Sequence, residues 1–320
     1  MTAVRLLGAA DIRAMADRLG MRPTKKFGQN FVLEQGSVRK IAALAAPRPG
    51  DVILEVGPGL GSLTLALLEA VAEAAGPAFT DGICGTAARD GAGTPPGPEM
   101  IPIRLVAVEI DPVLAAELPK TIAERAPALA GRVTVLTADA LTVGEREIGA
   151  PPPTVLAANL PYNVAVPVVL NLLAAFPSLA RGVVMVQAEV ADRMCAGPGS
   201  RVYGVPSAKL AWYADARTAG TVPRGVFWPV PNVDSKLVVF TRHDPPPTTA
   251  SREEVFAVID AAFGQRRKTL RAALANWAGS PAAAERLLDQ ALVPSGARGE
   301  QLGIDGFASI AQARKGDGSL

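Results

Sequence analysis

The segment from Val52 to Thr64 constrains the fold more than any other part of the chain. It reads VILEVGPGLGSLT, a run of apolar and β-branched residues that stops at glycine and continues as a helical pattern. Gly57, Gly59 and Gly61 leave the turn without side chains, so a ligand can approach the backbone. The helix that follows directs unpaired N–H groups at the same point. The pattern predicts a strand, a tight turn and a helix around a nucleotide-like ligand, although a turn without a ligand would look the same.

Further strands and helices alternate along the chain. The periodicity predicts helices near 11–19, 37–46, 62–75, 112–125 and 167–176. Strands are expected at 104–111, 132–141 and 182–190, within 154–170, and in the regions 209–221 and 226–240. This alternation predicts an α/β fold with a doubly wound, Rossmann-like sheet.

Polar side chains stand where three of these strands end. Glu109 closes RLVAVEID, Asp139 closes RVTVLTADAL, and Asn159 stands where the next strand gives way to loop. In a doubly wound sheet these ends share one edge with the glycine turn, so one pocket can collect them. A carboxylate at the position of Glu109 can accept two hydrogen bonds from ribose hydroxyls, while an exposed strand-end acid is the alternative.

Residues 76–102 interrupt this order. They are rich in Gly, Pro, Ala and Thr and have no periodicity, which predicts a long surface loop that contains Cys84. A connection from helix to strand belongs on the edge of the sheet opposite the ligand. The sequence therefore predicts an inserted loop that takes no part in the chemistry.

The composition restricts the class of protein. Hydrophobic residues make up 49% and the mean hydropathy is +0.25, but no uninterrupted apolar run reaches about 18 residues. Asp11 and Arg13 stand where a signal peptide would need its apolar core. We therefore expect a cytoplasmic protein without a membrane partner, and a monomer.

Cysteine and histidine are scarce. Cys84 and Cys195 are too few for a disulfide framework or a cysteine-rich metal site. The single histidine, His243, stands just before a proline run. We therefore expect neither a Ser-His-Asp triad nor a bound metal, and the chemistry must come from other groups.

Basic residues cluster although the net charge is only +2. Lys25 and Lys26 in KKFGQNFV could contact phosphates, although a solvated basic loop has the same composition. The segment 244–251, DPPPTTAS, separates an expected catalytic domain, 1–243, from an expected small all-α domain, 244–320. That tail is expected to carry a helix with one basic face, whose cations have no acid between them in the sequence: Arg266, Arg267, Lys268 and Arg271.

The tetrapeptide from Asn159 to Tyr162, NLPY, points to methyl transfer onto an exocyclic amine. The Asn159 side-chain oxygen and the Leu160 carbonyl can accept hydrogens from an adenine amino group and favour a localised lone pair on its nitrogen. Tyr162 can stack on the extruded base, which is worth roughly 1 to 3 kcal/mol. The transfer then requires positioning and no nucleophilic side chain.

With these residues the chain resembles the ribosomal RNA adenine dimethyltransferase family. The resemblance extends from about Thr24 to Leu302 apart from the inserted loop, and it rests on the motifs KKFGQNFV, LEVGPGLGSLT, VEID, DAL, NLPYN, MVQAEVADR, YGVPS, FWPVPNVDS, FGQRRKTL and RGEQL. It implies a cofactor, S-adenosylmethionine. Asn30 and Val32 would close over this cofactor, and Gly57, with Gly59 in the same turn, would lie beside its methionine part. Glu109 is assigned to its ribose.

The resemblance also implies a substrate. Asp139 is assigned to the adenine of the cofactor, and Asn159 to the reacting centre. The bacterial housekeeping branch of the family modifies two adjacent adenines near the 3′ end of 16S rRNA in a late small-subunit assembly particle, and this is the interpretation we favour. The chain departs from the family pattern in its inserted loop, in Val32 for Leu, and in Pro206 for Leu, which could alter a helix start.

Three alternative hypotheses share parts of this pattern. A nicotinamide dehydrogenase would explain the glycine turn and Glu109 but not NLPY or the basic tail. A non-catalytic assembly factor on the same fold would explain the basic regions. A resistance-type methyltransferase acting on one adenine of 23S rRNA would share the pocket and differ in target.

Overall fold

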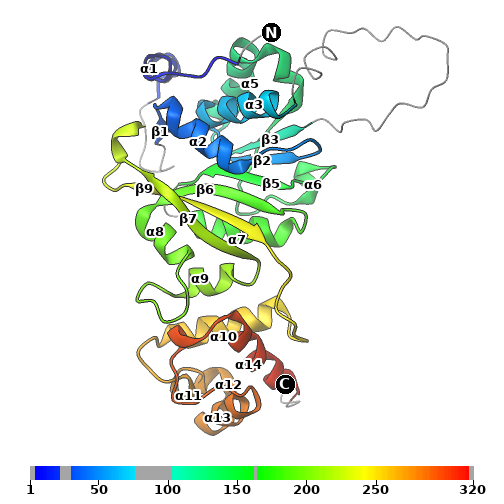
Figure 1. Ribbon diagram of the computed structural model, residues 1–320, viewed down its shortest axis with the longest axis vertical. Helices are drawn as coiled ribbons and strands as arrows, with labels where there is room; N and C mark the ends of the chain where they lie inside the picture. Colours follow the sequence, from blue (N-terminus) through cyan, green and yellow to red (C-terminus); the bar gives the residue numbers. More distant parts are fainter. Residues whose placement is uncertain (1–3, 22–29, 76–102, 162–163, 317–320) are drawn as a thin grey trace, which may run out of the picture. The chain divides into compact units, whose positions relative to one another are not determined.

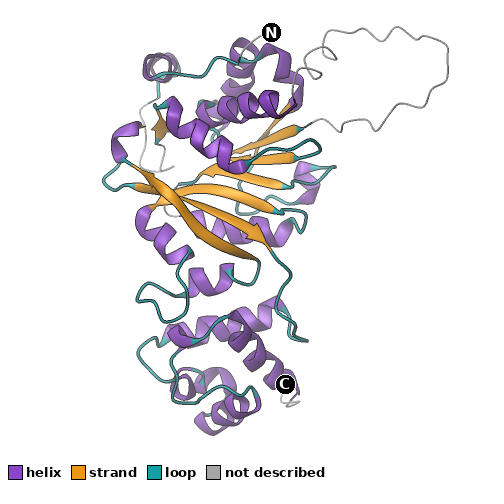
Figure 2. Cartoon of the chain, viewed as in Figure 1, coloured by secondary structure: helices purple, strands orange, loops and turns teal. Residues whose placement is uncertain are grey.

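The computed structural model describes residues 4–21, 30–75, 103–161 and 164–316, and its centre is a seven-stranded sheet (Figures 1 and 2). The strands lie in the order β4-β3-β2-β5-β6-β9-β7. They are β2 (Val52–Val56), β3 (Arg104–Glu109), β4 (Val133–Thr137), β5 (Val155–Asn159), β6 (Arg181–Gln187), β7 (Ala214–Val222) and β9 (Ser235–Arg242). The four pairings from β4 to β6 are parallel, which confirms the predicted α/β class.

Two short strands form a separate antiparallel pair. β1 (Phe31–Val32) pairs with β8 (Phe227–Trp228), so that Phe31 lies opposite Trp228 and Val32 opposite Phe227. The sequence did not predict this pair, because two residues are too few to show a period of two.

Helices cover both faces of the parallel strands (Figure 1). α2 (Gln35–Ala45), α3 (Ser62–Ala75) and α5 (Pro112–Arg125) lie on one face, and α7 (Ala165–Ala175) lies on the other. Alternate strand residues point to opposite faces, so both faces can be apolar, and all five residues of β2 are buried. α5 begins where it does because Asp111 caps it, accepting the Val113 N–H at 2.9 Å, and Pro112 supplies the first helical residue.

The bounds of α3 and α5 are those predicted, but α7 begins earlier. The sequence placed its start near Pro167, whereas the helix begins at Ala165. Proline is tolerated in the first turn of a helix, where its missing N–H would have had no partner inside the helix.

The chain divides into two compact units. The first consists of residues 1–188 and 219–239, and the second of 189–218 and 240–320. The second unit thus contains residues 189–218 in addition to the C-terminal segment that the sequence assigned to it. Within it the Tyr203 hydroxyl donates to the Leu302 carbonyl at 2.8 Å, and Lys209 pairs with Asp260 at 2.8 Å. These contacts join residues that are far apart in the sequence, so local sequence patterns could not predict them.

The second unit is mainly helical, and its first helix begins at the boundary with the first unit. The helices are α8 (Ala188–Met194), α9 (Val205–Leu210), α10 (Arg252–Gly264), α11 (Leu270–Ala273), α12 (Ala275–Ala278), α13 (Pro281–Gln290) and α14 (Ile304–Gly316). The prediction of one basic helix was wrong: α10 ends at Gly264, and Arg266, Arg267 and Lys268 lie in the turn before α11. Across the described ranges, none of the helices is long and apolar enough to cross a membrane.

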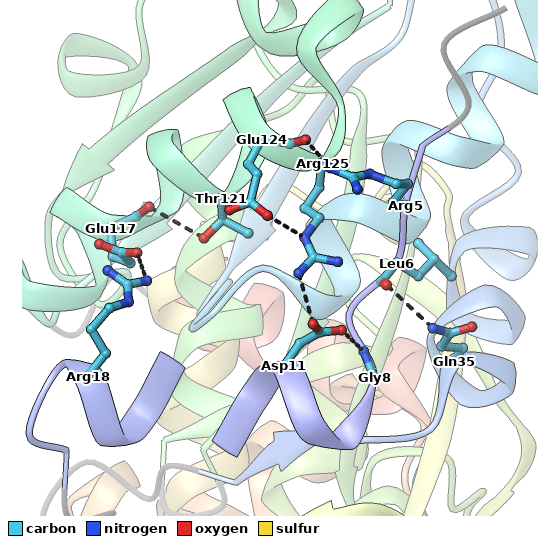
Figure 3. A network of polar contacts seen from close by, with 10 residues as sticks. All are labelled: Arg5, Leu6, Gly8, Asp11, Arg18, Gln35, Glu117, Thr121, Glu124 and Arg125. Carbon is cyan, nitrogen blue, oxygen red and sulfur yellow. Dashed lines mark hydrogen bonds and ion pairs between the residues drawn. The ribbon is translucent and has the colours of Figure 1, made fainter. Parts of the chain in front are cut away.

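The N-terminal helix α1 (Ala9–Arg18) is fastened to α5 by charged contacts (Figure 3). Arg125 donates to Asp11 at 2.8 Å, and Arg18 donates to Glu117 at 2.5 Å. The Glu117 side chain is only 4% exposed, so its charge depends on the two cations that pair with it, Arg18 and Lys120. The guanidinium of Arg18 is the main cause of the lowered pKa of Glu117.

Candidate active site

A cavity of about 350 Å³ opens at the carboxyl ends of β2, β3 and β5 in the first unit. Its lining includes the predicted residues Asn30, Val32, Gly57, Gly59, Glu109, Asp139, Asn159 and Leu160. The volume lies at the lower end of the range for small-molecule sites. The described residues that sequence reasoning assigned to one pocket therefore line one cavity.

The glycine turn forms the floor of this cavity. Gly57 and Gly59 have φ angles of +70° and +58°, a region that costs other residues roughly 1 to 3 kcal/mol. A Cβ at Gly57 would lie 3.5 Å from the Asn159 carbonyl oxygen, and one at Gly59 would lie 3.1 Å from the Phe31 ring. The turn, Asn159 and Phe31 thus approach one another closely, leaving a cradle that side chains would fill.

Glu109 presents a carboxylate to the cavity that is already aligned by the backbone. Its two oxygens accept the N–H groups of Gly59 and Asp111, each at 3.0 Å. Burial raises the pKa of Glu109, and the N–H groups of Asp111 and Gly59 oppose that shift. Each oxygen keeps a lone pair, so the pair suits two neighbouring hydroxyl groups such as those of a ribose.

Asp139 and two apolar side chains form part of the rim. Asp139 is half-buried, and one carboxylate oxygen accepts the Leu141 N–H at 2.9 Å. Ile110 and Leu141 line the cavity and are 49% and 37% exposed, a surface suited to a planar ring. Sequence reasoning missed both, although each follows closely after a strand-end acid, which is the signal that could have found them.

Asn159 and Leu160 stand where β5 ends. The Asn159 Nδ2 donates to the Asn30 carbonyl oxygen at 3.2 Å, and the Leu160 N–H donates to the Met185 carbonyl at 3.1 Å. Both anchors come from other parts of the first unit, so the position of this dipeptide is fixed. Tyr162, the predicted stacking residue, lies outside the described residues.

The predicted basic residues are not equivalent. Arg266 pairs with Glu300 at 3.1 Å and donates to the Arg201 carbonyl at 2.5 Å, and Arg271 pairs with Glu285 at 3.0 Å. Arg266 and Arg271 have no acid close to them in the sequence, but acids from distant parts of the chain pair with both.

Arg267 and Lys268 are exposed, and within the described part of the chain no ion pair is recorded for either. Lys25 and Lys26 lie outside the described residues, as does the segment 76–102 with Cys84.

The residues of the cavity fit S-adenosylmethionine. A glycine-rich turn at a helix start suits its amino-acid part, an aligned carboxylate suits its ribose, and an acid with apolar neighbours suits its adenine. Among the described residues, no three or more His, Cys, Asp and Glu side chains are grouped so that they could hold a metal ion.

Comparison with known proteins adds the family. A family model described as Ribosomal RNA adenine dimethylase matches residues 20–75 and 96–311. The Ribosomal RNA small subunit methyltransferase A of Kineococcus radiotolerans is 58% identical over 315 residues, which cover 97% of this chain and 92% of the relative. The protein of the same name from Thermobifida fusca is 57% identical over 310 residues, covering 97% of this chain and 96% of the relative.

Solved structures agree with the fold. The crystal structure of a dimethyladenosine transferase from Plasmodium falciparum has a TM-score of 0.64 at 21% identity and covers 88% of this chain and 95% of that chain. The 23S rRNA methyltransferase ErmE has a TM-score of 0.58 at 22% identity, covering 89% of this chain and 99% of that chain. These likenesses show the fold alone, whereas the family match and the relatives extend over nearly all of the chain. This chain therefore belongs to the ribosomal RNA adenine dimethylase family.

Proposed function

We propose that this protein transfers methyl groups from S-adenosylmethionine to N6 of adenine in ribosomal RNA. One observation carries the proposal: Asn159 and Leu160 line the same cavity as the glycine turn and Glu109, and the Gly57 position lies against the Asn159 carbonyl. Hydrogen-bond acceptors for an amino group thus lie beside the residues that fit the cofactor.

The residues of the chain do their work by orientation. S-adenosylmethionine, when bound, supplies a methyl group on a positively charged sulfur. Asn159 and Leu160 accept hydrogens from the adenine amine, which leaves the nitrogen lone pair free to face that methyl group. Glu109 and the glycine turn hold the other reactant, so two molecules meet in a fixed geometry, which can lower a barrier by roughly 7 to 11 kcal/mol.

The substrate we propose is 16S rRNA in a late small-subunit assembly particle. Two adjacent adenines near its 3′ end would each receive two methyl groups, giving N6,N6-dimethyladenosine. Relatives at 57% and 58% identity that carry the name Ribosomal RNA small subunit methyltransferase A support this choice. We place the reaction in the cytoplasm, where the particle is assembled, and propose a monomer as the active form.

RNA binding by the second unit is part of the proposal. Arg267 and Lys268 are the exposed cations for phosphate contacts, and we extend this role to Lys25 and Lys26. Arg266 and Arg271 have carboxylate partners, so phosphate contacts from them would compete with Glu300 and Glu285.

The test is product identification. Small subunits from cells that lack the modification are incubated with the protein and methyl-labelled S-adenosylmethionine, and the nucleosides of the digested RNA are separated by mass spectrometry. Large subunits serve as the second substrate. We expect N6,N6-dimethyladenosine in 16S rRNA alone.

Each other outcome identifies an alternative. Label in 23S rRNA alone would favour the resistance-type enzyme. Bound particles without label would favour an assembly factor. Calorimetry that shows a nicotinamide dinucleotide binding in place of S-adenosylmethionine would favour a dehydrogenase.

A further inference from the structure

The orientation of the Asn159 amide is set by a backbone group. A carbonyl oxygen can only accept, so the end of the amide that faces the Asn30 carbonyl, 3.2 Å away, must be the NH₂ end. The Oδ1 end is then directed away from Asn30. An amide turned by half a rotation would present a donor where the adenine amine needs an acceptor.

The Asn30 carbonyl is held in turn by β1, a strand of two residues. Three contacts from other elements hold β1: its pairing with β8, the Leu33 N–H donating to the Val226 carbonyl at 2.8 Å, and the Ser62 hydroxyl donating to the Val32 carbonyl at 3.1 Å. So short a strand makes too few ladder bonds to hold itself, and the contacts of its side chains add to these backbone contacts.

The Phe31 ring is the side chain that joins these parts. It is buried and lies against Gly59, where a Cβ would come within 3.1 Å of Cε1. It also stacks on the Trp228 indole, with ring centroids 6.2 Å apart and planes at 27°. Trp228 itself is absent from the cavity lining. The indole is therefore linked to the cavity through Phe31 and the β1–β8 pair.

We propose that Trp228 is a positioning residue for methyl transfer, which, together with the Ser62 hydroxyl, holds β1 where the Asn30 carbonyl orients the Asn159 amide. This rests on the proposed function. Trp228 acts on the reacting centre without touching it, through Phe31 and the backbone of Asn30. Loss of the indole frees β1, and the amide then samples orientations that cannot accept from the amine.

The test compares Trp228→Ala, Trp228→Phe and Val230→Ala. Val230 is 61% exposed and lies two residues after Trp228, just beyond β8, so its variant controls for loss of an apolar side chain from the same stretch of the chain. The readout is the single-turnover rate of methyl transfer to unmodified small subunits at saturating S-adenosylmethionine, with affinities for cofactor and particle measured separately.

We expect Trp228→Ala to slow transfer by about ten- to a hundredfold, with both affinities changed by less than about threefold. Trp228→Phe, which keeps a ring to stack on Phe31, should recover most of the rate, and Val230→Ala should match wild type. If Trp228→Ala does not fold, Ser62→Ala takes its place, with the same expected loss of rate.

Equal rates for Trp228→Ala and wild type would overturn the inference, and so would a Trp228→Phe variant as slow as Trp228→Ala. A rate loss explained wholly by weaker binding of the particle would overturn it too. A wild-type protein that transfers no methyl group would instead overturn the proposed function, and this inference with it.

Discussion

At the residue scale, we propose that the charge of Glu109 contributes most to cofactor binding. Its oxygens are aligned by two backbone N–H groups, and it is only 5% exposed. Because the backbone already fixes the carboxylate without a ligand, binding costs little side-chain conformational entropy at this position.

Glu109→Ala should weaken S-adenosylmethionine binding by roughly 1.5 to 3 kcal/mol, because the ribose hydroxyls lose a charged acceptor. Isothermal titration calorimetry on the folded variant measures this. Glu73→Gln, which removes an exposed acid near the end of α3, is the matched control and should bind as wild type does. Unchanged affinity in Glu109→Ala would remove Glu109 from the site.

Glu55 is a buried acid that sequence reasoning did not assign. It lies in β2 opposite Ala107 and Ala157 of the neighbouring strands, is fully buried, and neither carboxyl oxygen has a hydrogen-bond partner among the described residues. An unpaired charge is costly in such a place, and burial raises the pKa of Glu55 to about 8. An acid inside the apolar run VILEV is the signal that could have drawn attention to it.

The raised pKa predicts how stability depends on pH. Below 4.5, the ordinary value, Glu55 is protonated in the folded and unfolded states alike. Between 4.5 and about 8 the unfolded chain ionises while the folded protein keeps its proton, so the residue lowers stability as pH rises.

Glu55→Gln removes this dependence while keeping the shape of the side chain. As pH rises across that window, the free energy of unfolding of the variant should increase relative to that of wild type by about 1.4 kcal/mol per pH unit. Urea unfolding at several pH values provides the comparison. Parallel curves for the two proteins would show that Glu55 is ionised in the fold.

The place of single residues in the cavity was predictable where a sequence motif contained them. Gly57, Glu109 and Asn159 stand in sequence patterns whose chemistry is local, and the cavity unites them. Ser62 and Trp228 were not predictable, because their importance lies in contacts with β1, which is distant in the sequence.

At the scale of elements, ion pairs with α5 stabilise the position of α1 in the first unit. Both Asp11 and Glu117 have a lowered pKa, for which the main causes are the Gly8 N–H and Arg18 respectively. Carboxylates with a lowered pKa stabilise the fold above their ordinary pKa, and the stabilisation is lost as pH falls through the folded value.

Glu117→Gln should lower the free energy of unfolding by about 1 kcal/mol at neutral pH, a modest value because Arg18 is itself 57% exposed. The difference from wild type should shrink as pH falls below 4.5. Glu124→Gln on the same helix, where the side chain is 66% exposed, is the control and should have a smaller effect. Equal effects of the two substitutions would mean that burial of Glu117 does not matter.

The connection between α3 and β3 supports a separate prediction. α3 ends at Ala75 and β3 begins at Arg104, so the segment between them joins the ends of these elements away from the cavity. Replacing residues 76–98 by a short Gly-Ser linker should leave cofactor affinity and rRNA methylation within about tenfold of wild type, equivalent to roughly 1.4 kcal/mol. A folded variant with a larger loss would assign the segment a role in function.

Elements with strong periodicity were predicted well. The helices 62–75 and 112–125 have the bounds that their apolar periodicity indicated. The basic segment was not, because most residues that follow Gly264 in the run FGQRRKTLRAAL are good helix formers, whereas α10 ends at Gly264. Arg266 is held by Glu300 and the Arg201 carbonyl, contacts from other elements that override local propensity.

At the scale of the whole molecule, the basic segment of the second unit contains two cations paired with acids, Arg266 and Arg271, and two for which no ion pair is recorded among the described residues, Arg267 and Lys268. Arg267→Gln with Lys268→Gln should reduce the salt dependence of particle binding by about one unit of slope per lost phosphate contact. Arg286→Gln on α13 is the control for a lost exposed charge. Cofactor affinity should be unchanged in all of them, and an unaltered slope would mean that Arg267 and Lys268 serve solubility.

The division of the chain was harder to predict than its fold class. Composition marks the proline-rich linker near 244–251, but residues 189–218 join the second unit through contacts such as that of Tyr203 with Leu302. Such long-range packing follows from the folded surfaces of both segments, which periodicity and composition do not encode locally.

The central claim is that Asn159 orients an adenine amine for methyl transfer, and one measurement tests it most directly. Unmodified small subunits are methylated in a single turnover by wild type and by Asn159→Ala, both at saturating S-adenosylmethionine, and dimethyladenosine is counted by mass spectrometry. The account predicts that the variant folds and binds the particle but transfers methyl groups at least about a hundredfold more slowly. Transfer at the wild-type rate would contradict it.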